Sequence, residues 1–471
     1  TLEEEKGKHK CRIVIKDLKV IRQLPKALTY SPTPPLEAFR LLLAAFDPEN
    51  EEIYTIDFIT AYLQALQWAR KKWILVKIKD PETEETRYYW QTGPIYGGQT
   101  GGAEWYETIR KYLAEHMGFT ESLNAPSTYS NGTIRISKHV DDPVIVFKKC
   151  KQGQKDKAKF LKIMAEGFSI NEINELTPDN PIDYCSIRIQ KHTNGDISID
   201  NDTFIEKLLE KRGMTECNPA SRPINTDLLK QAAQERCDGL ILGSDAKTEH
   251  ESIIGDMNWL VSTTHPSLAT YVSIIAGFNA SPTESSLKLC RLLIRYAKGT
   301  IGRMLIKRHD DKSGYSVQGD SDHAGLWKLT GDTRSRMGIL IKYNGFPVAW
   351  KSAWIKARCV SSGEAETYAL SECVRWGLHI KYMGEELSID MPDKPTIMSD
   401  ATAALGFAGK TDGTGRMKHI DLREAWIKEL KSDDIIRVKV PGALNQADPF
   451  TKILSLSDFQ AHEDALMPRH E

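Results

Sequence analysis

The sequence lacks any run of about 18 uncharged apolar residues, the length at which a membrane-spanning helix becomes a candidate. Its first ten residues, TLEEEKGKHK, are charged where a secretory signal would be apolar. Both absences argue against a membrane-spanning or secreted protein. We therefore expect an intracellular protein without a membrane partner, and 40% apolar residues are enough for ordinary packed cores.

Paired cysteines and a strong net charge are absent as well. The eight cysteines are scattered and contain no Cys-x-x-Cys pair, so neither a zinc knuckle nor a disulfide framework is expected and the thiols should be reduced. The net charge of −1 excludes a protein coated in positive charge. Charge is nevertheless segregated locally along the chain.

One strongly basic segment, residues 288–308, carries seven basic residues and no acidic one. Four of them fall at helical spacing and would share one helix face: Lys288, Arg291, Arg295 and Lys298. A basic stripe of this kind suits a nucleic-acid phosphate backbone. The simpler alternative is a solvated helix face.

The pattern of residues divides the 471-residue chain into three parts. Alternating strand and helix patterns up to residue 215 include a hairpin at 73–91. Prolines and weak periodicity predict a linker at 216–250, after which helical patterns dominate to about residue 300. From residue 312, strands followed by helices predict a separate α/β domain.

Two adjacent carboxylates, Asp141 and Asp142, stand at a tight turn in SKHVDDPVIV, residues 137–146. Asp57 closes an earlier apolar strand, and if the strands are neighbours, Asp57 and Asp141 could share a pair of divalent cations. Two Mg²⁺ ions about 4 Å apart would activate a 3′ hydroxyl and neutralise the leaving pyrophosphate. Ordinary turn chemistry is the alternative, because Asp stabilises turns.

Tyr62 follows Asp57 by five residues, where a strand passes into a helix. Its ring could lie under the sugar of an incoming nucleotide, exclude a 2′ hydroxyl and so favour deoxynucleotides. A core aromatic is the alternative role.

A second set of acidic residues follows residue 312. Each member stands at the end of an element or within a central helix: Asp320, Glu366, Asp400 and Asp448, the last expected to open the final helix. Four carboxylates holding two metal ions would hydrolyse a phosphodiester. Taken singly, each has an ordinary alternative as a turn, N-cap or solvated residue.

Several segments occur in a characteristic order along nearly the whole chain. They include TIDFITAYLQA (55–65), GPIYGGQTGGAEWY (93–106), KHVDD (138–142), GDSDHAG (319–325), SSGEAETYAL (361–370), RMKHIDL (416–422) and NQADPFTKIL (445–454). In this order they resemble the reverse transcriptase and RNase H portion of copia-type LTR retrotransposon polyproteins.

The resemblance implies a right-hand polymerase followed by an RNase H-like α/β domain. Fingers and palm would occupy residues 1–215, a helical thumb and connection 216–311, and the RNase H-like domain 312–471. The implied protein copies RNA into DNA and degrades the RNA of the hybrid, from a longer polyprotein with other products. Its expected location is a cytoplasmic virus-like particle, with the nucleus as an alternative.

The resemblance also assigns roles to single residues. Asp57, Asp141 and Asp142 would be the polymerase carboxylates and Tyr62 the sugar gate, with Mg²⁺ or Mn²⁺ as cofactor, two ions per site. Further nucleotide contacts would come from Lys10, Arg12 and Gln99. The RNase H carboxylates would be Asp320, Glu366, Asp400 and Asp448, with Asp322 beside them not a ligand and His419 without an assigned role. The implied partners are an RNA template, a DNA primer or hybrid, and dNTPs.

The chain departs from the family pattern at two places. The usual Tyr-Gly-Leu-Lys-Gln-Ala-Pro-Arg is replaced after Gly97 by Gly-Gln-Thr-Gly-Gly-Ala, which removes the basic residues. His139 stands for the usual tyrosine before the turn, and Pro143 follows it. These departures favour the alternative of a degenerate element that binds nucleic acid without efficient catalysis. Retention of all seven carboxylates favours an active enzyme.

Overall fold

The computed structural model describes residues 24–65, 74–79, 83–91, 93–401, 405, 426–428, 430 and 434–469, with 2–5, 8–11 and 14. The chain forms two compact units. Unit 1 comprises Thr1–Pro35, Glu49–Leu176 and Glu386–Ser388; unit 2 comprises Leu36–Pro48, Thr177–Glu385 and Ile389–Glu471. Within the described ranges, no helix has the length and apolar character needed to cross a membrane.

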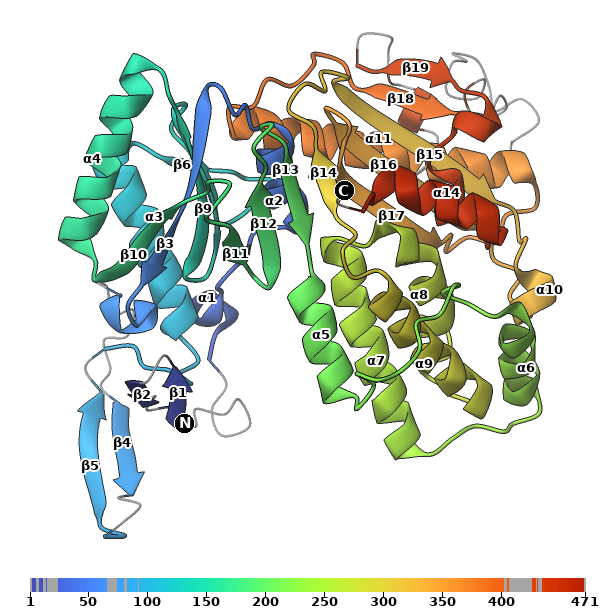
Figure 1. Ribbon diagram of the computed structural model, residues 1–471, viewed down its shortest axis with the longest axis horizontal. Coiled ribbons are helices and arrows are strands. Elements are labelled where there is room, and N and C mark those ends of the chain that lie inside the picture. Colours follow the sequence, from blue (N-terminus) through green and yellow to red (C-terminus); the bar gives the residue numbers. More distant parts are fainter. Residues whose placement is uncertain are drawn as a thin grey trace. The chain divides into compact units, whose positions relative to one another are not determined.

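Unit 1 is built on an antiparallel six-stranded sheet (Figure 1). In sheet order the strands are β10 (Ile170–Glu175), β3 (Glu51–Phe58), β9 (Asp142–Lys148), β8 (Ile134–His139), β7 (Thr128–Ser130) and β6 (Thr120–Glu121). Helices α3 (Gly101–Met117) and α4 (Lys151–Gly167) pack on one face of this sheet. Trp105, Phe147 and Phe160 are among the fully buried side chains between them.

Short elements complete unit 1: β1 (Leu2–Glu5), β2 (Lys8–Cys11), α1 (Lys26–Thr29), the 3-10 turn η1 (Ala61–Gln64), β4 (Ile74–Lys79) and β5 (Thr86–Gln91). Strands β4 and β5 pair antiparallel from Ile74 opposite Gln91 to Lys79 opposite Thr86. The predicted hairpin at 73–91 is therefore confirmed.

The first part of unit 2 is largely helical. Its helices are α2 (Leu36–Ala44), α5 (Asp202–Lys211), α6 (Thr226–Cys237), α7 (Ser244–Thr263), the 3-10 turn η2 (Pro266–Leu268), α8 (Ala269–Ala276) and α9 (Glu284–Gly299). The linker predicted at 216–250 is wrong, because α6 and the start of α7 lie there. Leu229 and Ala232 of α6 are fully buried in the helical core. Asn225 caps α6 by accepting hydrogen bonds from the amides of Asp227 and Leu228.

Two sheets belong to unit 2. The first is antiparallel, in the order β11 (Ile182–Tyr184), β12 (Ile187–Lys191), β13 (Ile197–Asp200) and β14 (Leu305–Lys307). The second runs β17 (Phe346–Trp354), β16 (Arg336–Tyr343), β15 (Tyr315–Asp322), β18 (Thr396–Ser399) and β19 (Ile436–Lys439). Strands β15, β16 and β17 are antiparallel, whereas β18 and β19 run parallel to β15.

Helices and 3-10 turns accompany this mixed sheet: α10 (Trp327–Thr330), α11 (Ser362–Glu386), η3 (Trp426–Lys428), η4 (Gly442–Leu444), η5 (Asp448–Phe450) and α14 (Leu456–Leu466). The α/β pattern predicted after residue 312 is confirmed. Asp448 opens η5 and not the final helix as predicted, since that helix begins eight residues later at Leu456.

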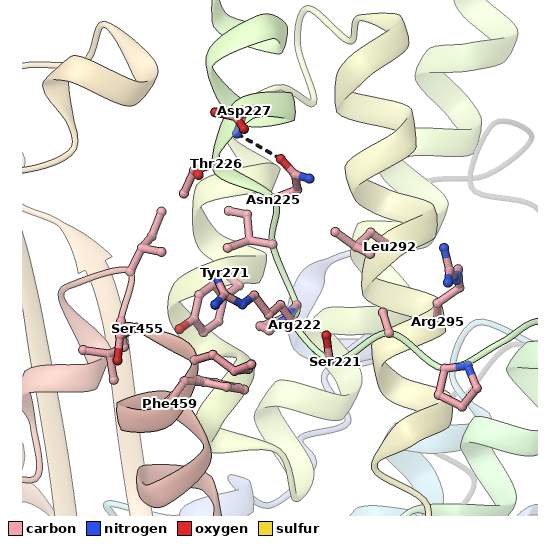
Figure 2. A pocket seen from close by; sticks show the side chains of 17 residues that line it. Ser221, Arg222, Asn225, Thr226, Asp227, Tyr271, Leu292, Arg295, Ser455 and Phe459 are labelled. Carbon is pink, nitrogen blue, oxygen red and sulfur yellow. Dashed lines mark hydrogen bonds between the residues drawn. The ribbon is translucent and has the colours of Figure 1, made fainter.

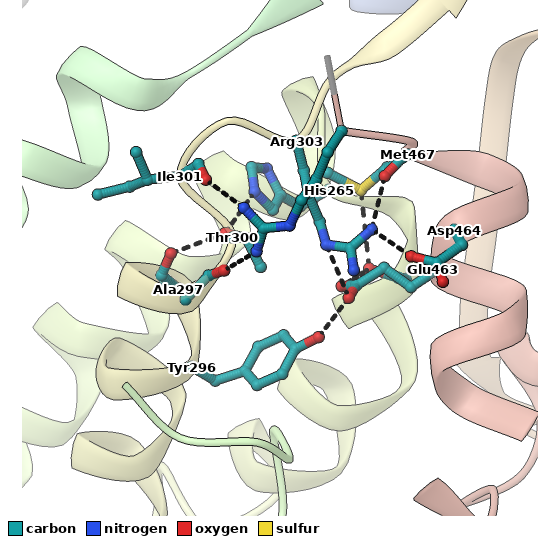
Figure 3. Close-up of polar contacts among 12 residues, drawn as sticks. His265, Tyr296, Ala297, Thr300, Ile301, Arg303, Glu463, Asp464 and Met467 are labelled. Atoms are coloured by element: carbon teal, nitrogen blue, oxygen red, sulfur yellow. Dashed lines mark hydrogen bonds and ion pairs between the residues drawn. The ribbon is translucent and has the colours of Figure 1, made fainter. Parts of the chain in front are cut away.

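A buried polar network joins α14 to the helical part of unit 2 (Figure 3). Arg303 forms an ion pair with Glu463 at 3.1 Å and a second with Asp464 at 2.7 Å. Tyr296 of α9 donates a hydrogen bond to the Glu463 carboxylate at 2.6 Å. A buried charge is tolerated only when it is paired and hydrogen-bonded, so these contacts hold α14 in one position on the helical core.

One of the boundaries between the two units falls between Leu176 and Thr177, within the predicted fingers-and-palm part. Unit 2 contains both the predicted helical connection and the α/β domain. The division at residues 215 and 311 stays a prediction.

Candidate active sites

The first group of carboxylates, Asp57, Asp141 and Asp142, lies at one end of the unit 1 sheet. Strands β3 and β9 pair with Thr55 opposite Val144, so continuing that register by two residues places Asp57 opposite Asp142. Strands β8 and β9 pair His139 with Asp142, which leaves Val140 and Asp141 as the turn. The three carboxylates predicted to act together are thus brought to the same end of adjacent strands, and all three are exposed.

Repulsion among these carboxylates contributes to a raised pKa at Asp142. Partial desolvation of its carboxylate by surrounding protein atoms, followed by the negative charges of Asp141 and Asp57, raises the pKa of Asp142 to about 6 although the residue is largely exposed. Asp57 accepts a hydrogen bond from the Asn171 amide at 2.8 Å. Hard carboxylate oxygens with excess negative charge are a donor set that suits Mg²⁺ or Mn²⁺. In the part of the chain that the structure describes, however, no three such side chains form a ready ligand cluster.

The turn itself is held in an unusual conformation. Val140 has a φ of 56°, in the left-handed region that a β-branched residue rarely adopts. Its carbonyl oxygen accepts hydrogen bonds from the Trp105 indole at 2.7 Å and from the Lys138 ammonium at 2.9 Å. Surrounding contacts therefore stabilise a strained residue directly before Asp141.

Tyr62 lies in η1, close to the same carboxylates. Its ring is tilted against that of Tyr96, with centroids 5.5 Å apart. Burial, and then the charge of Asp141, raises its pKa. A Cβ atom on Gly101 would lie 3.6 Å from the Tyr62 ring, and one on Gly102 would meet the Ser31 hydroxyl at 2.9 Å. The altered glycine-rich segment thus packs closely around Tyr62, a position that is consistent with the predicted sugar gate.

Of the other predicted nucleotide contacts, the structure describes the side chain of Gln99. Gln99 lies in the described segment before α3 and is half-buried. Lys10 falls in β2, whose side chains are outside the described residues, and Arg12 lies outside them altogether. The three assignments stay predictions.

The second group of carboxylates lies around the C-terminal ends of strands β15 and β18 in the mixed sheet of unit 2. Asp320 is in β15, Glu366 in α11, Asp400 directly after β18, and Asp448 at the start of η5. Burial, and also the charges of Asp448 and Asp400, raises the pKa of Asp320 to about 6. Burial and the charge of Asp400 raise the pKa of Glu366 as well. Asp320 therefore interacts electrostatically with Asp400 and Asp448, and Glu366 is linked to this group through Asp400.

This second group has cationic and hydroxyl partners of its own. Asp320 is 6% exposed and accepts a hydrogen bond from the Thr451 hydroxyl at 2.5 Å. Lys452 forms an ion pair with Asp448, and its ammonium lies 4.0 Å from an Asp320 oxygen. The donor type and charge suit divalent cations here too.

Two further residues of this region were considered in the sequence, Asp322 and His419. Asp322 accepts a hydrogen bond from the Gly325 amide at 3.0 Å, which agrees with a role in the turn rather than as a ligand. His419 lies outside the described residues.

The predicted basic stripe lies on α9, and its cations make contacts within unit 2. Arg291 pairs with Glu249 at 3.2 Å, Arg295 donates to the carbonyl of Asn218 at 2.8 Å, and Lys298 donates to that of Cys217 at 2.8 Å. Lys288 pairs with Glu284 one helical turn away at 3.7 Å. Part of the stripe thus attaches the 215–218 segment to α9, and its predicted role in nucleic-acid binding stays a prediction.

Arg295 also lines a cavity of about 510 Å³ in unit 2 (Figure 2). Arg222 projects into the same cavity beside Tyr271, and the hydroxyls of Ser221 and Ser455 lie at its wall. Two arginines, from α9 and from the segment before α6, therefore line this one cavity.

Sequence patterns did not single out two further features of unit 1. Tyr88, Tyr89 and Trp90 of β5 are all about half exposed or more, at 60%, 48% and 58%. Their signal was three successive aromatics in TRYYWQ, which ordinary alternation would have placed partly in a core. Lys138 gave no signal, because a lysine beside a turn is ordinarily solvated.

The chain is similar to known proteins in sequence and in fold. Residues 2–226 match the protein family described as "Reverse transcriptase (RNA-dependent DNA polymerase)". A solved structure entitled "Structure of the foamy viral protease-reverse transcriptase dRH in complex with ds DNA" superimposes with a TM-score of 0.50. It covers 93% of this chain and 64% of that chain at 14% identity, a likeness that shows the fold alone. The predicted polymerase fold followed by a further domain is thereby confirmed.

Nearly the whole chain is also similar to retrotransposon Pol polyproteins of plants. The chain is 23% identical over 476 residues to "Retrovirus-related Pol polyprotein from transposon TNT 1-94" of Nicotiana tabacum, covering 96% of this chain and 34% of the relative. It is 23% identical over 466 residues to the corresponding polyprotein from transposon RE1 of Arabidopsis thaliana, covering 96% and 30%. The chain thus spans about a third of the length of these relatives. In sequence, the chain is thus similar to the part of retrotransposon Pol polyproteins that includes the reverse transcriptase.

Proposed function

We propose that this chain copies RNA into DNA at the carboxylates of unit 1 and degrades the RNA strand of the resulting hybrid at those of unit 2. The observation that carries the polymerase part is that Asp57 and Asp142 lie at the same end of the paired strands β3 and β9, close enough for their charges to interact, beside the Val140–Asp141 turn. Retention of four acidic residues along one edge of the mixed sheet supports the second activity.

In this proposal the unit 1 residues divide the work. Asp57, Asp141 and Asp142 would hold divalent cations, which activate the primer 3′ hydroxyl and neutralise the leaving pyrophosphate. Tyr62, supported by Tyr96, would close the space beneath the sugar and so select deoxynucleotides. The exposed aromatics of β5 offer π-faces on which unpaired template bases can stack.

In unit 2, Asp320, Glu366, Asp400 and Asp448 would hold the cations that position a hydrolytic water against a phosphodiester. Thr451 orients the Asp320 carboxylate by donating to it, and Lys452 balances part of the negative charge. The proposed partners are an RNA template, a DNA primer and dNTPs, and binding should weaken steeply with salt because phosphate contacts release counterions.

A test of the polymerase proposal is primer extension on an RNA template with Mg²⁺, comparing the wild-type chain with Asp141→Asn. Extension by the wild type and not by Asp141→Asn would support it, and Glu366→Gln is the matched control that should extend normally. Equal extension by wild type and Asp141→Asn, or none by either, would contradict it.

The hydrolytic proposal is tested separately on a labelled RNA–DNA hybrid. Cleavage of the RNA should disappear in Glu366→Gln and persist in Asp141→Asn. Cleavage that survives Glu366→Gln would remove the assignment of this residue.

A second candidate function is nucleic-acid binding without efficient catalysis, as in a degenerate element. It is favoured by the loss of the basic residues between Gly98 and Ala103. Retained binding to a primer–template duplex by a chain that neither extends nor cleaves would support this alternative.

A further inference from the structure

Lys138, the next-to-last residue of β8, occupies a position where a charge is costly. It is 3% exposed, and its side chain lines a small apolar pocket with Phe58, Leu113, Pro143 and Phe160. Desolvation lowers the pKa of Lys138 to about 8. An apolar side chain would fill the same pocket without that cost, so core packing alone does not account for the lysine.

The ammonium group reaches out of this pocket to the catalytic turn. It donates to the carbonyl oxygen of Val140 at 2.9 Å, the same oxygen that accepts the Trp105 indole at 2.7 Å. That carbonyl belongs to the peptide plane between Val140 and Asp141. Two donors on one oxygen therefore fix the orientation of the peptide that leads into Asp141.

The conformation that these donors stabilise is unfavourable by itself. Val140 has a φ of 56°, and a β-branched residue in this region is strained. Without its partners the turn would relax toward other conformations and move Asp141. Trp105 lies in α3 and Lys138 in β8, so the turn is held from two directions.

The charge of Lys138 also matters to the carboxylates. Asp141 and Glu121 are the charged neighbours that favour its protonated form. Asp57, Asp141 and Asp142 lie at the same end of adjacent strands, where their like charges repel one another. A cation on the buried side of the turn offsets part of this repulsion while leaving the exposed side open to ligands.

We propose that Lys138 is a positioning residue of the polymerase site: its ammonium, together with the Trp105 indole, holds the Val140 carbonyl and thereby places Asp141 for metal binding. This inference rests on the proposed polymerase function. It differs from a structural role because removing the ammonium should alter metal affinity and turnover without weakening the fold.

The variant that separates these roles is Lys138→Met, which keeps the apolar volume and removes the charge and the donor. Trp105→Phe removes the second donor to the same carbonyl. Lys159→Met, an exposed lysine on α4, is the matched control. Mn²⁺ binding is measured by electron paramagnetic resonance on the wild type and these three variants. For this measurement all four chains also carry Asp320→Asn and Glu366→Gln, which weaken metal binding by the second carboxylate group.

Lys138→Met should melt no lower than wild type, since a buried charge is removed. Its Mn²⁺ affinity should fall about tenfold, as for other residues that orient a metal ligand. Primer-extension kcat should fall about tenfold or more while KM for dNTP changes little, because the displaced group is catalytic and not part of the nucleotide pocket. Hydrogen exchange at the amides of residues 139–142 should accelerate.

Unchanged Mn²⁺ affinity and unchanged exchange in Lys138→Met would overturn the inference, whatever primer extension shows. Should Lys138→Met fail to fold, Trp105→Phe decides: unchanged exchange at the turn would overturn the inference and faster exchange would support it. A wild-type chain that extends no primer contradicts the proposed function instead, and the Mn²⁺ and exchange measurements still decide the role of Lys138.

Discussion

The two carboxylate groups balance their negative charge in different ways. In unit 1 the acidic residues are exposed at the end of paired strands, and the nearby cation, Lys138, is buried behind the turn and bound to backbone. In unit 2 Asp320 is 6% exposed, and the half-buried Lys452 contacts the carboxylates directly. Water stabilises the negative charge of an exposed carboxylate, whereas a buried carboxylate needs cationic or hydrogen-bonding partners from the protein.

The largest effect should come from breaking one group while leaving the other intact. Asp57→Asn should lower primer extension by about 100-fold or more, and Asp448→Asn should do the same to cleavage of a preformed hybrid. Each variant should retain the other activity, measured in parallel on the same preparation. A loss of both activities in either variant would mean that the two groups do not work separately.

Metal-free stability should distinguish the buried group from the exposed one. The pKa of Asp320 in the folded chain, about 6, lies above its unfolded value near 3.9, so its contribution to stability is greatest at low pH and is lost as pH rises through 6. Asp320→Asn should therefore stabilise the chain by about 2 kcal/mol at pH 8 and by little at pH 4. Urea unfolding in EDTA measures both values.

Asp142→Asn is the comparison for that experiment. Its pKa is also raised to about 6, but the residue is exposed and solvent screens its charge, so the gain at pH 8 should be smaller than for Asp320→Asn. Equal gains in the two variants would contradict the contrast drawn between the two groups.

A smaller effect is expected at the sugar gate, which only the first group possesses. Tyr62→Val should increase ribonucleotide incorporation about tenfold relative to deoxynucleotides, since removal of a steric block is worth about 1–3 kcal/mol. Tyr62→Phe keeps the ring and should change little, and hybrid cleavage should be unaffected by both. Unchanged selectivity in Tyr62→Val would show that the ring is a core aromatic.

The smallest effect should follow loss of the cation in the second group. The Lys452 side chain is 43% exposed, so its ion pairs should contribute no more than about 1 kcal/mol. Lys452→Met should lower metal-free stability by that amount, compared with Lys356→Met, an exposed lysine. A much larger loss would indicate that Asp320 depends on Lys452 and not mainly on Thr451.

Local sequence patterns predicted much of the fold. The hairpin at 73–91, the Val140–Asp141 turn and the α/β pattern after residue 312 follow from alternation and turn residues, which act over a few positions. The helices between 216 and 250 were missed because only short parts of them are apolar. Leu229 and Ala232 become a buried face only when the rest of the helical core packs against them.

The candidate sites were predictable in their members and not in their surroundings. Asp57 and Asp141 were identified from their place at strand ends and from a family resemblance. Nothing in the sequence indicated that Lys138 is buried or that Lys452 lies 4.0 Å from Asp320. The surroundings of Lys138 and of Lys452 both depend on atoms that approach these side chains only in the folded chain.

By itself, the sequence determined the order of strands and helices in much of the chain and the acidic residues available for chemistry, because short-range periodicity and residue type are local properties. Tertiary structure alone decided that Asp57 lies within electrostatic reach of Asp142, that Asp320 is buried, and that Lys138 donates to Val140. Desolvation and charge interaction depend on which atoms are brought together, and strand pairing and packing settle that.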